Sequence, residues 1–176
     1  MDRLRIPFTC EAPNVDEDSV KLQDRDPLAT VQELANQKAR AVYERHPKSV
    51  VVGCDQAVVL DKRFFDKPGS IEAAIKQLRQ MRGQEHRLIT AVAIAHSGGM
   101  VEFTDTTRLT MRNLTNGEIA RYVHADRPLD CAGSYKIESL GISLFERIDS
   151  HDHTAIIGLP LLQLCRELRK LGVPLP

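Results

Sequence analysis

The sequence predicts an α/β protein with a mixed sheet and flanking helices. Segments with helical spacing of apolar residues alternate irregularly with short β-branched runs along the chain. Two of these runs, residues 87–95 and 100–111, are separated only by HSGG at 96–99, which favours a hairpin. Because a hairpin pairs antiparallel neighbours, a regular doubly wound parallel sheet is not expected.

Length and composition limit the classes of protein to consider. We expect 176 residues to form one domain over 1–176, and 42% apolar with 27% charged residues is typical of a globular chain. A formal net charge of zero favours a small ligand over nucleic acid or a membrane surface. The chain contains no membrane-length apolar run, no signal-peptide core and no CxxC pair among its four cysteines. We therefore expect a cytoplasmic protein with reduced thiols that binds neither nucleic acid nor membrane.

The N-terminal part is expected to enter a strand at residues 6–8 and then to form an acidic loop at 12–18, APNVDED. Loop carboxylates of this kind are either solvated or ligands of a hard cation such as magnesium. Asp26-Pro27 then predicts a helix, with an N-cap aspartate and a proline at the first helical position. His46-Pro47 ends this helix at about residue 45.

Lys38 is unusual in this helix because it lies on the apolar side. The apolar stripe consists of Leu28, Val31, Leu34, Ala35, Ala39 and Val42. At 100° per residue, Lys38 falls near the middle of the stripe. Its ammonium group either extends past its neighbours to water or supplies a fixed positive charge to a cleft.

The stretch VVVGCDQAVVLDKRFFDK at 50–67 carries the strongest functional signal. Its apolar runs, 50–52 and 57–60, are predicted as buried strands, with GCDQ between them. An unpaired carboxylate beside buried apolar residues is energetically costly. We therefore expect Asp55 to bind a metal, to pair with a lysine or to accept a proton. The alternative is a turn aspartate bonded to its own backbone.

A turn at KPG, 67–69, precedes a helix expected from about residue 70, and Gly83 marks its end. Thr115 and Glu118 have the spacing of a capping box, which predicts the start of a short helix ending near residue 124.

The last part of the chain combines a small-residue segment with a strand and a helix. CAGSYKIE at 131–138 permits close backbone approach to a ligand or forms an ordinary loop. A strand is expected at 142–148 and a final helix at 159–172. The HDH sequence at 151–153 is more typical of an exposed loop than of a metal site.

Taken together, these segments resemble the Maf-type nucleoside triphosphate pyrophosphatases. The matching pieces follow the family order and span nearly the whole chain: APNVDE (12–17), LANQKA (34–39), VVGCDQAVVLD (51–61), DKP (66–68), CAGSYKIESLGISLFERI (131–148) and IIGLPLLQLCRELRKLG (156–172). The residue types at positions 56 (Gln) and 138 (Glu) resemble those of the family branch associated with 7-methyl-GTP. The resemblance implies a Maf/ITPase-like fold with two lobes around a nucleotide cleft.

The implied reaction is hydrolysis of a nucleoside triphosphate, here 7-methyl-GTP, between its α and β phosphates to a monophosphate and pyrophosphate. By position in the family motifs, Asp55 corresponds to the proton acceptor and Gln56 and Glu138 to specificity positions. Lys38 and Lys67 correspond to lysines that hold phosphates. A carboxylate at 138 can accept hydrogen bonds from a guanine and attract the positive charge of its 7-methylated ring.

The resemblance also implies a divalent cation, Mg²⁺ or Mn²⁺, with Glu17 and Asp55 as its candidate ligands. Attack on phosphorus needs a positioned, activated water, and a carboxylate can accept its proton or hold a metal that lowers the pKa of the water. The triphosphate charge needs lysines and a divalent cation to offset it. The expected partner is a small-molecule nucleoside triphosphate, and a homodimer is compatible with the sequence.

The resemblance is incomplete at the N-terminus. Family members usually begin with a strand and an SxSPRR-type loop, which would bring arginines and backbone N–H groups to the phosphates. MDRLRIPF aligns after that loop, so we expect either a start site assigned too late or a shortened protein with weaker turnover and an exposed strand edge.

Two alternative functions follow from other features. A chain without the phosphate loop can be a nucleotide-binding regulatory protein with weak or no catalysis. A thiol hydrolase using Cys54 or Cys131 is disfavoured because no histidine lies near either cysteine in a recognisable pattern.

Overall fold

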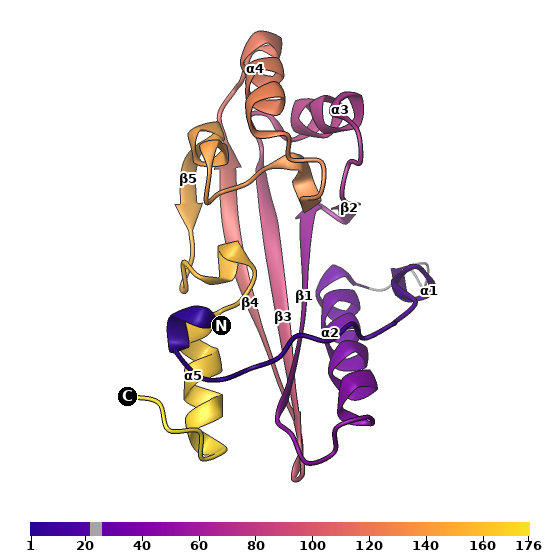
Figure 1. Cartoon of the computed structure of the whole chain (residues 1–176). Helices are drawn as coiled ribbons and strands as arrows, with labels where there is room; N and C mark the ends of the chain where they lie inside the picture. The colour runs from indigo at the N-terminus through magenta and orange to yellow at the C-terminus, as the bar shows by residue number, and fades with distance from the viewer. Residues whose placement is uncertain (22–25) are drawn as a thin grey trace.

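The computed structural model describes residues 1–21 and 26–176, and its centre is a five-stranded sheet (Figure 1). The strands are β1 Val51–Leu60, β2 Arg63–Phe65, β3 Glu85–His96, β4 Gly99–Met111 and β5 Phe145–Asp149. Their order is β2-β1-β3-β4-β5, and each neighbouring pair is antiparallel. The α/β class is confirmed, but the pairings of the described residues include no parallel pair, although a mixed sheet was expected.

The antiparallel order follows from the connection between β1 and β3. The helix in that connection, α3 (Ile71–Met81), lies at one end of the sheet instead of running back along its face (Figure 1). Val59, near the end of β1, pairs with Arg87 near the start of β3. The chain therefore re-enters the sheet at the end where it left, which makes the two strands antiparallel.

Helices α2 (Pro27–Tyr43) and α5 (Leu161–Lys170) cover opposite faces of one half of the sheet, whereas α3 and α4 (Asn116–Asp126) gather at the other end (Figure 1). α1 spans Glu17–Lys21, and the 3₁₀ helices are η1 Asp2–Leu4, η2 Ala132–Ser134, η3 Leu140–Leu144 and η4 Ala155–Ile157. Among the described residues, no helix combines the length and the apolar character needed to cross a membrane.

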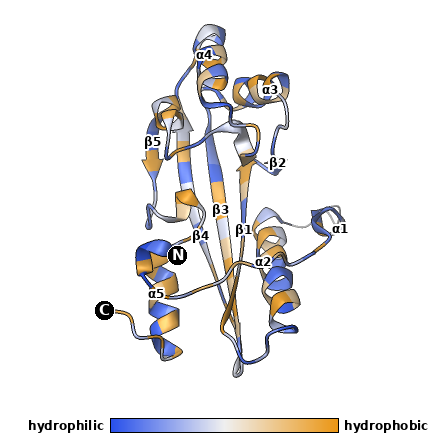
Figure 2. Ribbon diagram, in the orientation of Figure 1, coloured by the Kyte–Doolittle hydropathy of each residue, from blue (hydrophilic) through white to orange (hydrophobic). Residues whose placement is uncertain are grey.

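The core divides into parts that correspond to two lobes. In the half that carries α2 and α5, alternate residues of β3 face each helix: Ile89 and Ala91 pack with the α2 side, and Val92 packs with the α5 side. In the other half, α3, α4 and the far ends of the strands enclose a separate cluster around Leu78 and Ile119. Figure 2 shows the apolar colouring concentrated on the central strands and on alternate positions of the helices.

β1 is one continuous strand, whereas the sequence suggested two strands flanking GCDQ. Gly53 of this strand lets α2 come close, because it has no side chain. A Cβ placed there would lie 2.5 Å from Ala35 O and 2.5 Å from Ala39 N of α2. The helix therefore packs directly on the strand. Residues 53, 55 and 57 share the face toward α2, and this alternation places Asp55 under the helix.

The local helix signals agree with the structure. The Asp26 carboxylate accepts a hydrogen bond from Leu28 N at 3.1 Å, and the capping box between Thr115 and Glu118 is formed in both directions. Gly83 follows the C-cap of α3 with φ of 68°, as expected for a left-handed C′ residue.

Other boundaries differ from the sequence expectation. Residues 6–8 have no strand, and η3 occupies the first part of the strand expected at 142–148. β2 was not expected, since three residues are too short for a periodic signal. α2 ends at Tyr43 and α4 continues to Asp126, so each helix end moves by about one turn or less.

Gly53→Ala should reduce the free energy of unfolding by about 2 kcal/mol or more, because the added methyl group meets α2 backbone atoms that cannot move independently. Chemical denaturation monitored by circular dichroism measures this. The matched control is Gly117→Ala in α4, where a Cβ would lie 3.4 Å from the flexible end of Arg121 and 4.0 Å from Thr115 Oγ1, so no loss of stability is expected. Equal stability of the wild type and Gly53→Ala would contradict the close packing.

Candidate functional site

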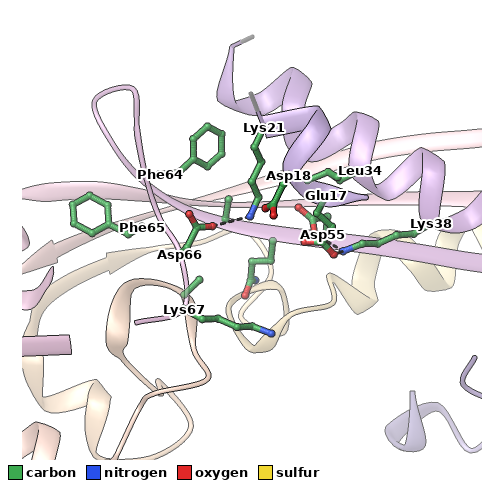
Figure 3. A pocket seen from close by; sticks show the side chains of 13 residues that line it. Glu17, Asp18, Lys21, Leu34, Lys38, Asp55, Phe64, Phe65, Asp66 and Lys67 are labelled. Atoms are coloured by element: carbon green, nitrogen blue, oxygen red, sulfur yellow. Dashed lines mark hydrogen bonds and ion pairs between the residues drawn. The ribbon is translucent and has the colours of Figure 1, made fainter. Parts of the chain in front are cut away.

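A cavity of about 440 Å³ lies where α1, α2, β1 and the segment after β2 meet (Figure 3). Its charged lining residues are Glu17, Asp18, Lys21, Lys38, Asp55, Asp66 and Lys67. Its remaining walls come from Leu34, Gln56, Ala57, Phe64, Phe65 and Ala132. A cavity lined in this way suits a small ligand with both charged and apolar parts.

The cavity contains a three-membered charge cluster of Lys38, Asp55 and Glu17. The Lys38 Nζ atom lies 2.7 Å from Asp55 Oδ1 and 2.7 Å from Glu17 Oε1. The side chains of Lys38 and Asp55 are only 16% and 12% exposed, whereas that of Glu17 is 43% exposed. Lys38 therefore does not extend past its neighbours to bulk water, and Asp55 is not a turn residue. α2, β1 and the first turn of α1 each supply one member.

Burial and pairing shift the protonation equilibria of the cluster. Burial raises the pKa of Asp55 above its ordinary value, and the hydrogen bond from Lys38 only partly opposes this. The hydrogen bond from Lys38 lowers the pKa of Glu17. Burial acts to lower the pKa of Lys38, but Asp55 and Glu17 together raise it above the usual lysine value. Lys38 thus stays charged, and Asp55 is a stronger base than a free aspartate.

Lys67 and an ion pair at the cavity mouth complete the charged lining. The Lys21 Nζ atom lies 2.7 Å from Asp66 Oδ1, which joins α1 to the segment after β2 across the mouth. Lys67 is exposed, and Figure 3 shows its side chain extending along the cavity in the direction of Asp55. No ion pair among residues 1–21 and 26–176 involves Lys67. Its ammonium group is therefore available to an anionic ligand.

The structure places the two specificity candidates away from this cluster. Gln56 contributes to the cavity wall, but its amide nitrogen donates to Thr90 Oγ1 and to Ala155 O, each at 2.7 Å. Because neighbouring residues of a strand point to opposite faces, the Gln56 amide lies on the sheet face opposite to Asp55. Glu138 is exposed between η2 and η3 and does not line the cavity.

Sequence reasoning missed Lys21, Asp66 and Phe64 as parts of the cavity. Lys21 and Asp66 are 45 residues apart, so nothing in the local pattern signals their pairing. Phe64 is half-buried on the unexpected strand β2. The only sequence signal was the apolar pair FF directly before DKP.

The surroundings of Cys54 argue against the alternative function as a thiol hydrolase. Burial, with a further contribution from Asp55, raises the pKa of the Cys54 thiol to about 12. Its Sγ atom donates to Gly158 O at 3.1 Å, on the face opposite to Asp55. Burial also raises the pKa of Cys131. Because the thiolate is the nucleophile, neither cysteine is activated for attack at neutral pH.

The HDH segment at 151–153 stabilises the start of α5. One Asp152 carboxylate oxygen accepts from Thr154 N and Oγ1, and the other accepts from Leu162 N at 2.7 Å, so Asp152 anchors the start of α5. Among the described parts of the chain, no group of three or more His, Cys, Asp and Glu side chains is arranged to hold a metal.

Lys38→Met should raise the pKa of Asp55 further, because the substitution removes the hydrogen bond and the charge that oppose the effect of burial. The pKa of Glu17 should rise as well, since Lys38 is the main cause of its lowering. A ¹³C NMR titration of the side-chain carboxyl groups measures both. Lys170→Met, at the far end of α5, is the charge-matched control and should leave Asp55 unchanged. An unchanged or lower pKa of Asp55 in Lys38→Met would contradict the pairing.

A family model and several known proteins match this chain over nearly its whole length. The family model described as Maf-like protein matches residues 1–171. The 7-methyl-GTP pyrophosphatase of Aromatoleum aromaticum is 45% identical over 178 residues, covering 100% of this chain and 91% of that protein. The 7-methyl-GTP pyrophosphatase of Polaromonas sp. is 45% identical over 177 residues, covering 99% of this chain and 80% of that protein. The nucleoside triphosphate pyrophosphatase of Acinetobacter baylyi is 42% identical over 181 residues, covering 100% of this chain and 90% of that protein. The protein therefore belongs to the Maf family.

Proposed function

We propose that this protein is a nucleoside triphosphate pyrophosphatase. It hydrolyses the bond between the α and β phosphates and releases a nucleoside monophosphate and pyrophosphate. The observation that carries the proposal is the buried Asp55 carboxylate paired with Lys38 in a cavity that Lys67 also borders. The names of relatives at 42–45% identity support the same reaction class.

In this reaction Asp55 accepts the proton of the attacking water. Burial raises its pKa above the ordinary aspartate value, which makes the ionised carboxylate a better base. Water forms a new bond to phosphorus, the anhydride bond breaks, and the electron pair leaves with the pyrophosphate. Lys38 and Lys67 offset the negative charge that moves onto the leaving group.

A divalent cation, Mg²⁺ or Mn²⁺, fits the donor set formed by Glu17 and Asp55. One oxygen of each carboxylate already converges on a single positive group, the Lys38 ammonium. Carboxylate oxygens are the ligands that these cations prefer, and Mg²⁺ is commonly bound by one or two carboxylates together with substrate phosphates. When bound, such a cation supplies positive charge that stabilises the phosphates. Glu17, the more exposed carboxylate, would hold it at the open side of the cavity.

We propose 7-methyl-GTP as the preferred nucleotide, because relatives that match 99–100% of this chain carry that substrate in their names. Glu138 remains our candidate for attracting the positively charged base. Gln56 stabilises the cavity wall, because its amide nitrogen is held by Thr90 and Ala155. We further propose one domain over residues 1–176 and action in the cytosol, where its four free thiols would remain reduced.

A regulatory protein without catalysis is not favoured. A ligand-binding role alone needs cations for the phosphates, but it does not need a carboxylate held in a largely buried position with a raised pKa. The relatives in the comparison are also named as pyrophosphatases.

The purified chain should release pyrophosphate from a panel of nucleoside triphosphates in the presence of Mg²⁺ or Mn²⁺, fastest with 7-methyl-GTP. Asp55→Asn should lower kcat by about 10²–10⁴-fold, because an amide cannot accept the proton. Cys54→Ala, one residue away and on the opposite face, is the control and should keep full activity. Nucleotide binding without pyrophosphate release by the wild type would favour the regulatory alternative.

The activity should also fall as the pH is lowered. Asp55 acts only when ionised, so kcat/KM decreases as the pH falls through its pKa, which burial holds above the ordinary aspartate value. Lys38→Met should move this acidic limb to higher pH, since Lys38 opposes the effect of burial. A pH profile of kcat/KM with no acidic limb above the ordinary aspartate range would contradict the role of Asp55.

Glu138→Gln should reduce the preference for 7-methyl-GTP over GTP by about tenfold, because the neutral amide loses its attraction for the charged ring. The measurement is the ratio of kcat/KM for the two nucleotides. Glu146→Gln, an exposed carboxylate on β5, serves as the charge-matched control. An unchanged ratio in Glu138→Gln would assign base selection to other residues.

A further inference from the structure

Gln77 of α3 connects two segments that border the cavity but lie far apart in the sequence. Its Nε2 atom donates to Asp66 O at 2.9 Å. Its Oε1 atom accepts from Ser134 Oγ at 2.6 Å. Asp66 directly precedes Lys67, and Ser134 belongs to η2, which begins with the cavity residue Ala132. One side chain thus connects the lysine-bearing segment to the small-residue segment.

We propose that Gln77 is a positioning residue, which acts on the reaction by holding Lys67 in place for the phosphates. This inference rests on the proposed pyrophosphatase function, in which the exposed Lys67 ammonium binds the triphosphate. Gln77 does not itself line the cavity, so its effect passes through the backbone at Asp66.

The segment that carries Lys67 needs such support. Residues 66–69 lie between the end of β2 and the start of α3 and belong to neither element. The hydrogen bond from Gly69 N to Leu129 O, at 3.0 Å, holds the far side of this segment. The bond from Gln77 holds the backbone of the near side at Asp66, whereas the ion pair with Lys21 contacts only the exposed Asp66 side chain. Without Gln77, the near side loses this anchor and the Lys67 backbone gains conformational freedom.

The other partner of Gln77 is rigid. Ser134 is fully buried with φ of 62°, and Gly133 has φ of 71°, so two consecutive residues adopt the left-handed conformation. A Cβ at position 133 would lie 2.8 Å from a methyl group of Val58 on β1. Tight packing on β1 therefore fixes this turn. Gln77 transfers that rigidity to the Lys67 segment.

A fixed backbone matters for a lysine because its side chain is long and flexible. Binding must already restrict several side-chain torsions, and each additional mobile group adds an entropic cost. Holding the backbone at position 66 reduces this cost. The structure thus leads us to expect an effect on substrate binding, and little effect on proton transfer to Asp55, which lies on β1.

The test compares Gln77→Met with wild type in steady-state pyrophosphate release from 7-methyl-GTP. Methionine has nearly the same length and shape but makes neither hydrogen bond. We expect KM to rise roughly tenfold, with kcat changed by less than about threefold and the pH profile unchanged. The control is Gln84→Met, the same substitution at an exposed glutamine of the same lobe whose amide donates to Gln80 O, and its KM should match wild type.

A double-mutant cycle separates positioning from a general structural effect. In a Lys67→Met background, Gln77→Met should produce little further rise in KM, because the residue through which it acts is already absent. Ser134→Ala, which removes only one of the two bonds, should give a smaller rise and provides a second variant if Gln77→Met does not fold. An equal effect of Gln77→Met with and without Lys67 would overturn the inference.

The outcomes also separate this inference from the proposed function. A wild type that releases pyrophosphate, together with Gln77→Met and Ser134→Ala variants of unchanged KM, would overturn the role of Gln77 alone. A wild type that releases no pyrophosphate from any nucleotide of the panel would overturn both.

Discussion

The ion pair between Lys38 and Asp55 is the interaction on which the site depends. It joins the C-terminal half of α2 to the middle of β1 at 2.7 Å, in a place where both side chains are largely removed from water. An isolated charge there would be costly, and each group offsets that cost for the other. The close approach at Gly53, two residues earlier on the same strand face, makes the pair geometrically possible. The same contact that packs the helix thus also places the base.

The charges of the site come from both lobes. α2 and β1 supply Lys38 and Asp55 from the half of the sheet that carries α2 and α5, while Lys67 comes from the segment that leads into α3. A ligand with several negative charges can therefore contact both lobes at once. The Lys21–Asp66 ion pair also reaches across this junction, from α1 to the segment after β2. Because it is exposed, it is expected to contribute little to stability.

Buried polar groups behind the site support it from the other sheet face. The Gln56 amide is held by Thr90 and the backbone of η4, and the Cys54 thiol donates to Gly158. These contacts satisfy polar atoms that would otherwise be buried without partners. They also connect β1 to the segment that leads into α5, so the strand that carries Asp55 is held on both faces.

Local sequence determined the helix starts and ends and identified the two unusual charges. Caps and the capping box depend on residues within one turn of each other, which is why Asp26, Thr115 and Glu118 were predictable. Lys38 and Asp55 stood out because a charge on an apolar face or beside a buried strand contradicts its surroundings. The motifs also sufficed to suggest the family, which the comparisons confirm.

Only the tertiary structure decided how these pieces meet. The continuous β1 and the antiparallel return to β3 depend on α2 and α3 packing against residues distant in sequence. The bonds of Gln77 to Asp66 and Ser134 join positions 11 and 57 residues away, and no local pattern encodes them. The physical reason is that side-chain pairing across a cavity depends on where the backbone places each residue, and that placement results from packing the whole core.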